Sequence, residues 1–383
     1  MKPPVPVLHV MNNTSDGSIS RIVERIIRQS DKDEFAWHVS GVSGLGEMEQ
    51  VYRELGARVI DFSPQANHGV PPKKTIGRYI VDQEIQILHS HTPRTIMDSW
   101  RGIHAARFGV SKKPIHLATK HVINSPFDRK NGWIYFLIDQ FTLFLPDHLV
   151  PVSRTMAREI AQLPGLSEAK ITAIPNAIPC ENYYLPQERE NARKLYCLEA
   201  DMVAIGFTGR LSQVKRLDLL LEAFAKTIKV FPRVHLLIAG NGELHQQLEQ
   251  QTHQLGIASK VTWMGFYKDI HRFLSALDIY VQPSINEGLS LSILEAMAAG
   301  LPVITTRVGS AEEIIEDGQT GILIHPKSAL SIEAALIKLL ENPEMRNRIA
   351  GNARQSVLAH YNIQKMTAAY LQLYRNLLGN ILS

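Results

Sequence analysis

Two carboxylates in the C-terminal half are spaced so that they could bind an extended polar ligand. Glu287 precedes a predicted helix that begins near Leu289, and Glu295 would lie about two turns inside that helix. One carboxylate at a loop and one deeper in a helix can accept hydrogen bonds from different hydroxyls of a polyol. Glu287 could instead be a helix-start acid favoured by the macrodipole, but a carboxylate inside an otherwise apolar helix is costly without a partner.

Two cations and a glycine pair follow other apolar runs of the same half. Arg210 and Lys215 come after GFTG, with Lys215 at the start of the next helical pattern. Cations beside a helix N-terminus favour a diphosphate, because both the charge and the terminal N–H groups attract anions. A pair of surface cations is the alternative interpretation. Gly240-Asn241-Gly242 would let a ligand approach the backbone, although any βα turn can use glycines.

The elements that must position these residues are short apolar runs alternating with amphipathic stretches. Continuous apolarity is typical of strands buried on both faces of a parallel sheet. The pattern predicts an α/β fold of two tandem Rossmann-like, doubly wound domains facing each other across a cleft, residues 1–180 and 181–362. The predicted strands are 5–10, 35–40, 57–62, 85–90, 115–119 and 148–152, then 202–209, 234–240, 260–265, 279–284, 301–306 and 321–326. Ligands should bind beyond the carboxyl ends of these strands.

Composition narrows the class of protein. The chain has 383 residues, 45% hydrophobic and 20% charged, which excludes a disordered or collagen-like protein. A formal charge of only +4 argues against a nucleic-acid partner. Two cysteines cannot form a disulfide framework, and no apolar region of signal-peptide length follows the N-terminus, so we expect a cytoplasmic protein.

One part of the chain is strongly basic and is followed by an apolar segment. Residues 71–130 carry eleven Lys or Arg against four Asp or Glu. Such a stretch favours an anionic membrane surface or an acidic acceptor, or it is simply a solvated face. The apolar residues 133–145 are too few to span a membrane, and we expect them to form a buried helix rather than a shallow membrane contact.

The segment EGLSLSILEAMAAGLPVI, residues 287–304, closely resembles the motif of family-four retaining glycosyltransferases with the GT-B fold. Arg210 and Lys215 match that family's phosphate-binding pair. Gly309–Glu312 stands where the family usually has Gly-Gly-x-Pro-Glu, but the second glycine and the proline are absent. Stretches around Ser153 and Asn176 also match, so the resemblance covers roughly residues 5–360.

The resemblance extends to three sites in the N-terminal half. Gly17 and Ser18 correspond to a glycine-rich turn near the donor phosphates, with one glycine where two are typical. His121 matches a catalytic-site histidine. His89 and His91 match a stretch that could face the acceptor, although for His89 a structural role is the favoured interpretation.

The resemblance implies retaining transfer of a hexose-type sugar from a UDP- or GDP-sugar. The basic residues 71–130 lead us to expect a glycan or lipid-linked acceptor, in cell-surface polysaccharide or lipopolysaccharide synthesis. Arg210 and Lys215 would neutralise the departing diphosphate, so no metal or other cofactor is expected. Glu287 and His121 would contact the transferred sugar. The expected donor-binding residues are Gly17, Ser18, Arg210, Lys215, Asn241, Gly242, Gly288, Leu289, Ser290 and Glu295, the last on the ribose.

The resemblance also implies that residues 363–383 return to the N-terminal domain. Because the expected donor-binding residues lie in both halves, we expect closure of the two domains to complete the site. The basic residues 71–130 lead us to expect that the protein can associate with the inner face of the membrane. A nucleotide-sugar epimerase of the same fold and a non-catalytic nucleotide-sugar-binding protein stay open as alternatives. A dehydrogenase is disfavoured because no G-x-G-x-x-G follows the first strand. A phosphorylase would need a cofactor-bearing lysine and a longer chain.

Overall fold

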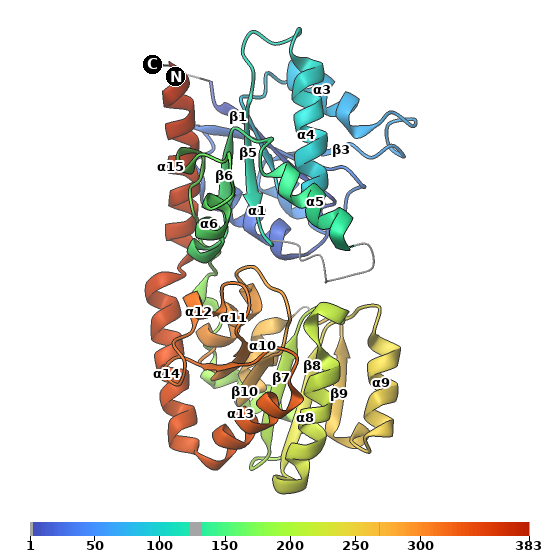
Figure 1. Ribbon diagram of the computed structural model, residues 1–383, viewed down its shortest axis with the longest axis vertical. Helices are drawn as coiled ribbons and strands as arrows, with labels where there is room; N and C mark the ends of the chain where they lie inside the picture. Colours follow the sequence, from blue (N-terminus) through green and yellow to red (C-terminus); the bar gives the residue numbers. More distant parts are fainter. Residues whose placement is uncertain (1–2, 123–131, 268, 383) are drawn as a thin grey trace. The chain divides into compact units, whose positions relative to one another are not determined.

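The computed structural model describes residues 3–122, 132–267 and 269–382, which form two compact units (Figure 1). Unit 1 comprises residues 1–176 together with 363–383, and unit 2 comprises residues 177–362. The predicted boundary after residue 180 lies four residues beyond this division.

Unit 1 is an α/β domain with a six-stranded sheet. Its strands are β1 (Val5–Met11), β2 (Phe35–Gly41), β3 (Arg58–Asp61), β4 (Ile87–Ser90), β5 (Ile115–Lys120) and β6 (His148–Pro151). Its helices are α1 (Ser18–Gln29), α2 (Glu49–Glu54), α3 (Pro72–Asp82), α4 (Pro93–Ala106), α5 (Gly132–Thr142), α6 (Arg154–Ala161) and α15 (Ile363–Leu382).

Unit 2 repeats this architecture. Its strands are β7 (Val203–Thr208), β8 (Val234–Ala239), β9 (Val261–Gly265), β10 (Ile279–Gln282), β11 (Val303–Thr306) and β12 (Ile322–Ile324). Its helices are α7 (Arg189–Leu195), α8 (Leu217–Val230), α9 (His245–Gln254), α10 (Ile270–Ala276), α11 (Leu291–Ala298), α12 (Ala311–Ile314), α13 (Ala329–Glu341) and α14 (Pro343–His360).

Both sheets are parallel and share one topology. The strand order is β3-β2-β1-β4-β5-β6 in unit 1 and β12-β11-β10-β7-β8-β9 in unit 2, which is the same order when each unit is numbered from its first strand. The predicted α/β class with two Rossmann-like sheets is confirmed, and every strand lies inside or within one residue of its predicted range. In each sheet the strands are added outward in one direction from the first strand and then, from the fourth strand on, in the other direction. The position between the first and fourth strands is the switch point where such folds bind ligands.

The two faces of the unit 1 sheet differ in chemistry. One face packs Leu8, Val10 and Leu88 against α3 and α4 in an apolar cluster. On the other face His9 and His89 stand side by side in the registered pair of β1 and β4, and His89 contacts Tyr374 of α15. Imidazoles are therefore part of this core.

The core of unit 2 contains a cluster of buried residues that are all apolar. Strand residues such as Ile205, Phe207 and Val281 pack against Leu220 of α8 and Leu336 of α13, all of them fully buried. Burial of these strand residues explains why the strands are rich in apolar side chains.

Helix α5 corrects the expectation of a buried helix over residues 133–145. Gly132, Asp139 and Thr142 are its buried residues, and the Asp139 carboxylate forms an ion pair with Lys120 at the end of β5. Six large apolar or aromatic residues are instead between 42 and 62% exposed: Trp133, Ile134, Tyr135, Leu137, Ile138 and Phe141. The buried ion pair turns the polar side of the helix inward, so its apolar side faces outward.

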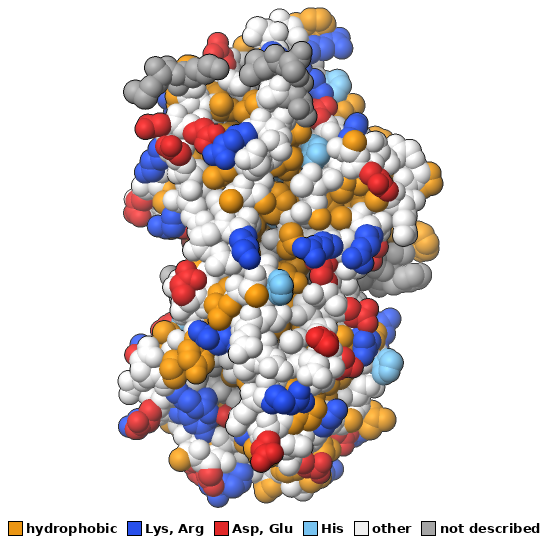
Figure 2. Space-filling model, turned by 90° about the vertical axis from the view of Figure 1, so that its left-hand side faces the viewer, with side chains coloured by type: hydrophobic (Ala, Val, Ile, Leu, Met, Phe, Trp, Pro, Cys, Tyr) orange, Lys and Arg blue, Asp and Glu red, His pale blue; other side chains and the backbone are white. Residues whose placement is uncertain are grey.

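Surface side chains of both charge signs are present. On the face drawn in Figure 2, acidic and basic side chains are interspersed without a broad field of one sign. Across the described residues, every helix is too short or too polar to cross a membrane.

Candidate functional site

The loops at the carboxyl edge of the unit 2 sheet converge at its switch point. The loop after β7 contacts the loop after β10 through the Ile285 N–H, which donates to the Val214 carbonyl at 2.9 Å. The loop after β8 joins them where the Leu211 N–H donates to the Asn241 carbonyl at 3.0 Å. Side chains from strands on both sides of the switch point are therefore brought within reach of one ligand.

Lys215 and Glu287 form the centre of this edge. Lys215 ends a short 3-10 helix (Gln213–Lys215) before α8, and its Nζ donates to Glu287 Oε1 at 2.6 Å. The side chains are 18 and 15% exposed, so the pair is sheltered but open to solvent. The structure thus joins a predicted phosphate-binding cation to a predicted sugar-binding carboxylate.

A third side chain holds Glu287 in place. Gln282, the last residue of β10, donates through Nε2 to the same Glu287 Oε1 at 2.8 Å and to Ser290 Oγ at 2.9 Å. Within the described part of the chain, Glu287 Oε2 accepts no hydrogen bond, which leaves one carboxylate oxygen for a ligand. Behind Gln282, the Tyr280 hydroxyl donates to its Oε1 at 3.2 Å.

Sequence reasoning missed Gln282 and Tyr280. Gln282 carried a usable signal, since it is a polar residue at the carboxyl end of an apolar strand, 0% exposed and directly before the loop. Tyr280 gave no such signal, because an aromatic residue in a buried strand is ordinary.

Glu295 is buried in α11 and already hydrogen-bonded. The helix begins at Leu291 rather than near Leu289, so Glu295 lies about one turn inside and not two. Its Oε1 accepts a hydrogen bond from the Tyr183 hydroxyl at 2.9 Å, and the residue is 5% exposed. The expected high cost of an unpaired buried carboxylate is thereby avoided.

Arg210 is a predicted phosphate-binding residue that lies outside this hydrogen-bond network. Its side chain is 75% exposed and contacts Glu243 at 3.2 Å. Among the described residues, it forms no hydrogen bond with Lys215 or Glu287. Any diphosphate contact by Arg210 would therefore use a solvent-exposed guanidinium.

The glycines of these loops serve loop packing. A Cβ at Gly240 would lie 1.8 Å from the Gly209 carbonyl oxygen, and one at Gly242 would lie 2.4 Å from the Leu211 oxygen. At Gly309, where φ is +55°, a Cβ would lie 1.9 Å from the backbone carbonyl oxygen of Glu287. These positions need glycine even without a ligand, because the loops after β7, β8, β10 and β11 press against one another. Gly288 and Leu289 lie in the same loop as Glu287, with Leu289 buried.

A cavity of about 300 Å³ in unit 2 lies at the opposite edge. Asp278 and Pro302 line it, and these residues immediately precede β10 and β11. Because ligands of this fold bind at the carboxyl ends of strands, the Lys215–Glu287 edge is the better candidate.

In unit 1 the predicted glycine turn begins a helix. Gly17 is the N-cap of α1, which starts at Ser18, and its φ of −147° is ordinary extended backbone. A Cβ at Gly17 would meet nothing closer than 4.0 Å. The helix N-terminus suits an anion, and the fold itself does not require glycine there.

His121 follows β5 and is partly exposed. Burial, assisted by the nearby Lys120 cation, lowers its pKa to about 3, so the imidazole is neutral at pH 7. Its Nε2 lies 3.3 Å from Nδ1 of His91. His89 is a core residue with both nitrogens bonded, Nδ1 to the Tyr374 hydroxyl and Nε2 to the Thr119 hydroxyl, each at 2.7 Å.

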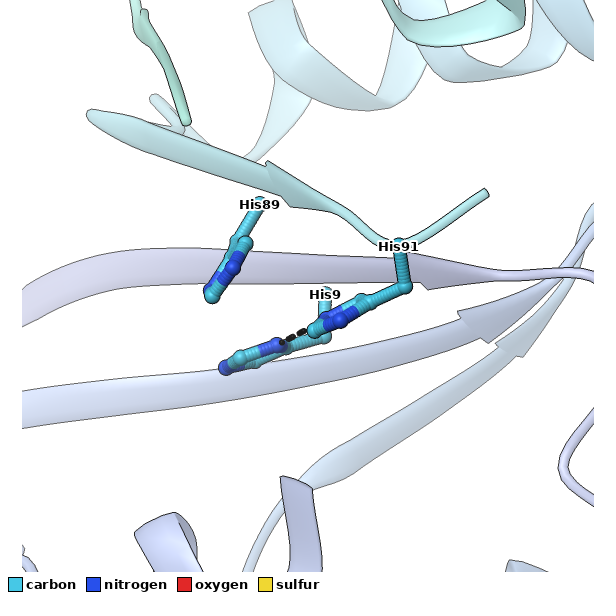
Figure 3. A group of neighbouring side chains, drawn as sticks. All are labelled: His9, His89 and His91. Atoms are coloured by element: carbon cyan, nitrogen blue, oxygen red, sulfur yellow. Dashed lines mark hydrogen bonds between the residues drawn. The ribbon is translucent and has the colours of Figure 1, made fainter. Parts of the chain in front are cut away.

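His9, His89 and His91 lie close enough together to suggest a metal site, with ligand atoms within 4.8 Å of one another (Figure 3). Their bonding does not suit that role. His9 Nδ1 and His91 Nε2 share a direct hydrogen bond at 3.0 Å, and both His89 nitrogens are committed to hydroxyls. The group is a hydrogen-bonded histidine cluster.

Two family models match the chain, one on each half. "Glycosyltransferase Family 4" matches residues 19–182, and "Glycosyl transferases group 1" matches residues 189–356. The second match contains Lys215, Gln282, Glu287 and Glu295.

Two relatives of the chain are named as glycosyltransferases. An uncharacterised glycosyltransferase of Methanocaldococcus jannaschii is 30% identical over 239 residues, 60% of this chain and 61% of the relative. A lipopolysaccharide core biosynthesis glycosyltransferase of Rhizobium meliloti, LpsE, is 30% identical over 174 residues, 45% of this chain and 50% of the relative. The chain thus aligns with one half to three fifths of these two proteins.

Solved structures share the fold. HepE of Anabaena, in complex with UDP-glucose, matches with a TM-score of 0.85 and 19% identity over 97% of this chain and 99% of that one. Sucrose-phosphate synthase of Thermosynechococcus elongatus matches with a TM-score of 0.77 and 20% identity over 98% of this chain and all of that one.

Proposed function

We propose that this chain, which belongs to the group 1, family 4 glycosyltransferases with the GT-B fold, transfers a hexose-type sugar from a nucleotide-diphosphate donor with retention of configuration. The observation that carries the proposal is the Lys215–Glu287 pair at the switch point of unit 2, at 2.6 Å and sheltered from solvent. The pair places a cation that can bind a phosphate next to a carboxylate that can bind a sugar.

Each member of the pair has a distinct role in this proposal. Lys215 binds the diphosphate and stabilises the negative charge that develops as the sugar–phosphate bond breaks. Glu287 accepts a hydrogen bond from a sugar hydroxyl through Oε2, while Gln282 and Lys215 hold Oε1. Glu295, held by Tyr183, binds the ribose.

Arg210 shares the leaving-group charge by exchanging its exposed Glu243 contact for a phosphate oxygen. Two cations then perform the neutralisation for which other transferases use a divalent ion, so we propose that transfer needs no metal. Activity that survives complete chelation would support this proposal, and activity that returns only with Mg²⁺ or Mn²⁺ would oppose it.

The donor is a UDP-sugar in this proposal. The similar HepE structure contains UDP-glucose, although its 19% identity speaks for the fold and not for the ligand here. The acceptor is a glycan or lipid-linked glycan, an assignment supported by the lipopolysaccharide-core relative. A GDP-sugar donor is the second possibility to be measured.

The first experiment is a thermal-shift screen against UDP, GDP, ADP, CDP and dTDP with EDTA present. A nucleotide at 100 times its Kd adds about 2.7 kcal/mol of stability, which is readily seen as a raised Tm. We expect the shift with UDP, its loss in Lys215→Ala, and its retention in Lys226→Ala, a matched exposed lysine on α8. Absence of any shift, with or without Mg²⁺, would contradict the donor site.

A second measurement separates an enzyme from a binding protein. The matching UDP-sugar incubated with the protein should release UDP by slow hydrolysis even without an acceptor. Binding with no release and no transfer to any glycan acceptor would favour the non-catalytic alternative.

We also propose peripheral contact between unit 1 and an anionic membrane, through α5. Apolar side chains exposed on one short helix are unfavourable in water and suit the boundary of headgroups and acyl chains. Helix α4 packs against α5, and α3 packs against α4. These two neighbours and the residue that caps α4 carry six exposed cations: Lys73, Lys74, Arg78, Arg94, Arg101 and Arg107.

Vesicle flotation tests this contact. The protein should float with phosphatidylcholine vesicles that contain phosphatidylglycerol, less so at high salt, and hardly with phosphatidylcholine alone. Leu137→Ser with Phe141→Ser should weaken flotation at unchanged Tm, whereas Leu330→Ser, at a 68% exposed leucine of unit 2, should not. Equal flotation of all three proteins would refute the role of α5.

A further inference from the structure

Three histidines of unit 1 form a hydrogen-bonded chain that ends at His121. His9 lies on β1, His91 directly follows β4, and His121 directly follows β5, and these three strands are neighbours in the sheet. His9 Nδ1 lies 3.0 Å from His91 Nε2, and His91 Nδ1 lies 3.3 Å from His121 Nε2. Figure 3 shows the first of these bonds, with the two rings nearly parallel.

All three rings are neutral near pH 7. Burial lowers the pKa of His9 to about 3 and takes the pKa of His91 well below its ordinary value, with the neighbouring histidines adding to the effect at His91. A neutral imidazole carries one proton and one lone pair, so each must donate from one nitrogen and accept at the other. Choosing the tautomer of one ring therefore fixes the tautomer of all three.

Only two arrangements satisfy both bonds. In the first, the Nδ1 atoms of all three rings carry the protons, and each ring donates towards His121. In the second, the Nε2 atoms carry the protons, and each ring donates towards His9. His9 Nε2 decides between them, because it is fully buried and has no hydrogen-bond partner in the described structure.

The second arrangement would bury an N–H group without an acceptor, which is the rarest kind of unsatisfied group in protein interiors. The first leaves only a lone pair at that nitrogen. The chain is therefore directed outward, and Nδ1 of His121, the nitrogen that is not bonded to His91, carries a proton.

We propose that His91, anchored by His9, is a positioning residue that holds His121 as its Nδ1–H tautomer, so that His121 acts on the substrate as a hydrogen-bond donor. The part concerning substrate rests on the proposed function. In this state His121 cannot accept a proton at Nδ1 unless all three rings reverse. It suits a sugar oxygen that gains negative charge and does not suit the role of general base.

The test combines NMR with kinetics. Long-range 1H–15N spectra of 15N-histidine-labelled protein separate protonated from unprotonated ring nitrogens, and His121→Gln assigns the signals. Wild-type protein without ligand should show His121 protonated at Nδ1. His91→Leu should release the ring to a tautomer mixture, and His91→Asn should restore Nδ1–H, since its amide nitrogen can take the place of His91 Nδ1.

The kcat values of these variants should follow the extent to which His121 keeps its Nδ1–H tautomer. Loss of one neutral hydrogen bond predicts a roughly five-fold lower kcat in His91→Leu, a smaller loss in His9→Leu, near-complete rescue in His91→Asn, and little change in donor KM. His38→Leu is the matched control, because His38 is a buried histidine of the same sheet that is bonded to Tyr79 instead.

Wild-type His121 protonated at Nε2 would overturn the proposal without any variant. So would a His91→Leu protein whose tautomer and kcat match those of His38→Leu. Because the spectra need no substrate, they decide the tautomer even if the protein transfers no sugar, which would refute only the proposed function.

Discussion

The two units share one sheet topology but place different side chains at its carboxyl edge, a charged pair in unit 2 and neutral histidines in unit 1. At the switch point of unit 2, a lysine and a glutamate lie 2.6 Å apart and are partly open to solvent. At the corresponding edge of unit 1 stand His91 and His121, which are neutral and hydrogen-bonded to each other. The fold supplies the location, and the side chains after the strands supply the chemistry.

Burial explains why His91, which is 3% exposed, is neutral. A charge is costly where water is excluded, whereas an imidazole can remain neutral and satisfy its two nitrogens locally. At this edge of unit 1 the ion pair of Lys120 with Asp139 is enclosed, with the side chains 3 and 0% exposed. In unit 2 the Lys215–Glu287 pair lies where water can reach it.

The largest expected effect is on the stability of unit 1. Lys120→Met leaves the enclosed Asp139 carboxylate without its lysine and should cost about 3–5 kcal/mol of unfolding free energy. Lys215→Met should cost less than about 1 kcal/mol, because its pair is partly solvated. Urea unfolding of both variants measures the contrast, and equal losses would mean that burial does not distinguish the two ion pairs.

The next effect is on catalysis in unit 2. Lys215→Ala and Glu287→Ala should each lower kcat by about 10²–10³-fold, the range expected for removal of a group that stabilises transition-state charge. Both proteins should retain the wild-type circular dichroism spectrum. Near-normal turnover in either, with Lys226→Ala as the reference, would place the site elsewhere.

The sequence predicted the fold more completely than the site. Twelve predominantly apolar runs correspond to the twelve strands of the described residues, because strands covered on both faces are rich in apolar side chains. Lys215 and Glu287 were predicted and do meet, since residues after neighbouring parallel strands share one edge. Gln282 was missed because its role is to hold Glu287, a relation that exists only in three dimensions.

Helix α5 shows where pattern reasoning fails. An apolar segment predicts a buried helix because apolar residues usually face the core. Here Asp139 faces the core because Lys120 lies there, and the partner is 19 residues away in the sequence. No periodicity within residues 133–145 could reveal that pairing. The histidine chain was likewise hidden, because β1, β4 and β5 become neighbours only through the strand order.

A smaller effect concerns acid stability. Burial lowers the pKa of His116 to about 3, with Asp147 opposing the shift and Lys113 adding to it. Below pH 6.5 the unfolded chain binds a proton that the folded unit excludes, so stability falls between about pH 6.5 and 3. His116→Leu should remove about 2 kcal/mol of the stability difference between pH 7 and pH 5.

Urea unfolding at the two pH values measures that difference. Trp263 is the single tryptophan of unit 2, and Trp263→Phe makes tryptophan fluorescence report on unit 1 alone. An unchanged pH dependence in His116→Leu would show that His116 is protonated in the folded unit or exposed in it.

The smallest expected effect separates a ligand-contacting glycine from structural ones. Gly17→Ala should change the free energy of unfolding by less than about 1 kcal/mol, because φ is extended and the nearest atom to the added Cβ is 4.0 Å away. If donor phosphates approach the N-terminus of α1, the same methyl group should raise the donor KM several-fold. Gly351→Ala, in open space on α14, is the control and should leave the KM unchanged. A stable Gly17→Ala protein with wild-type KM would confine the donor site to unit 2, and the contrast between the two edges would then be one of binding as well as of charge.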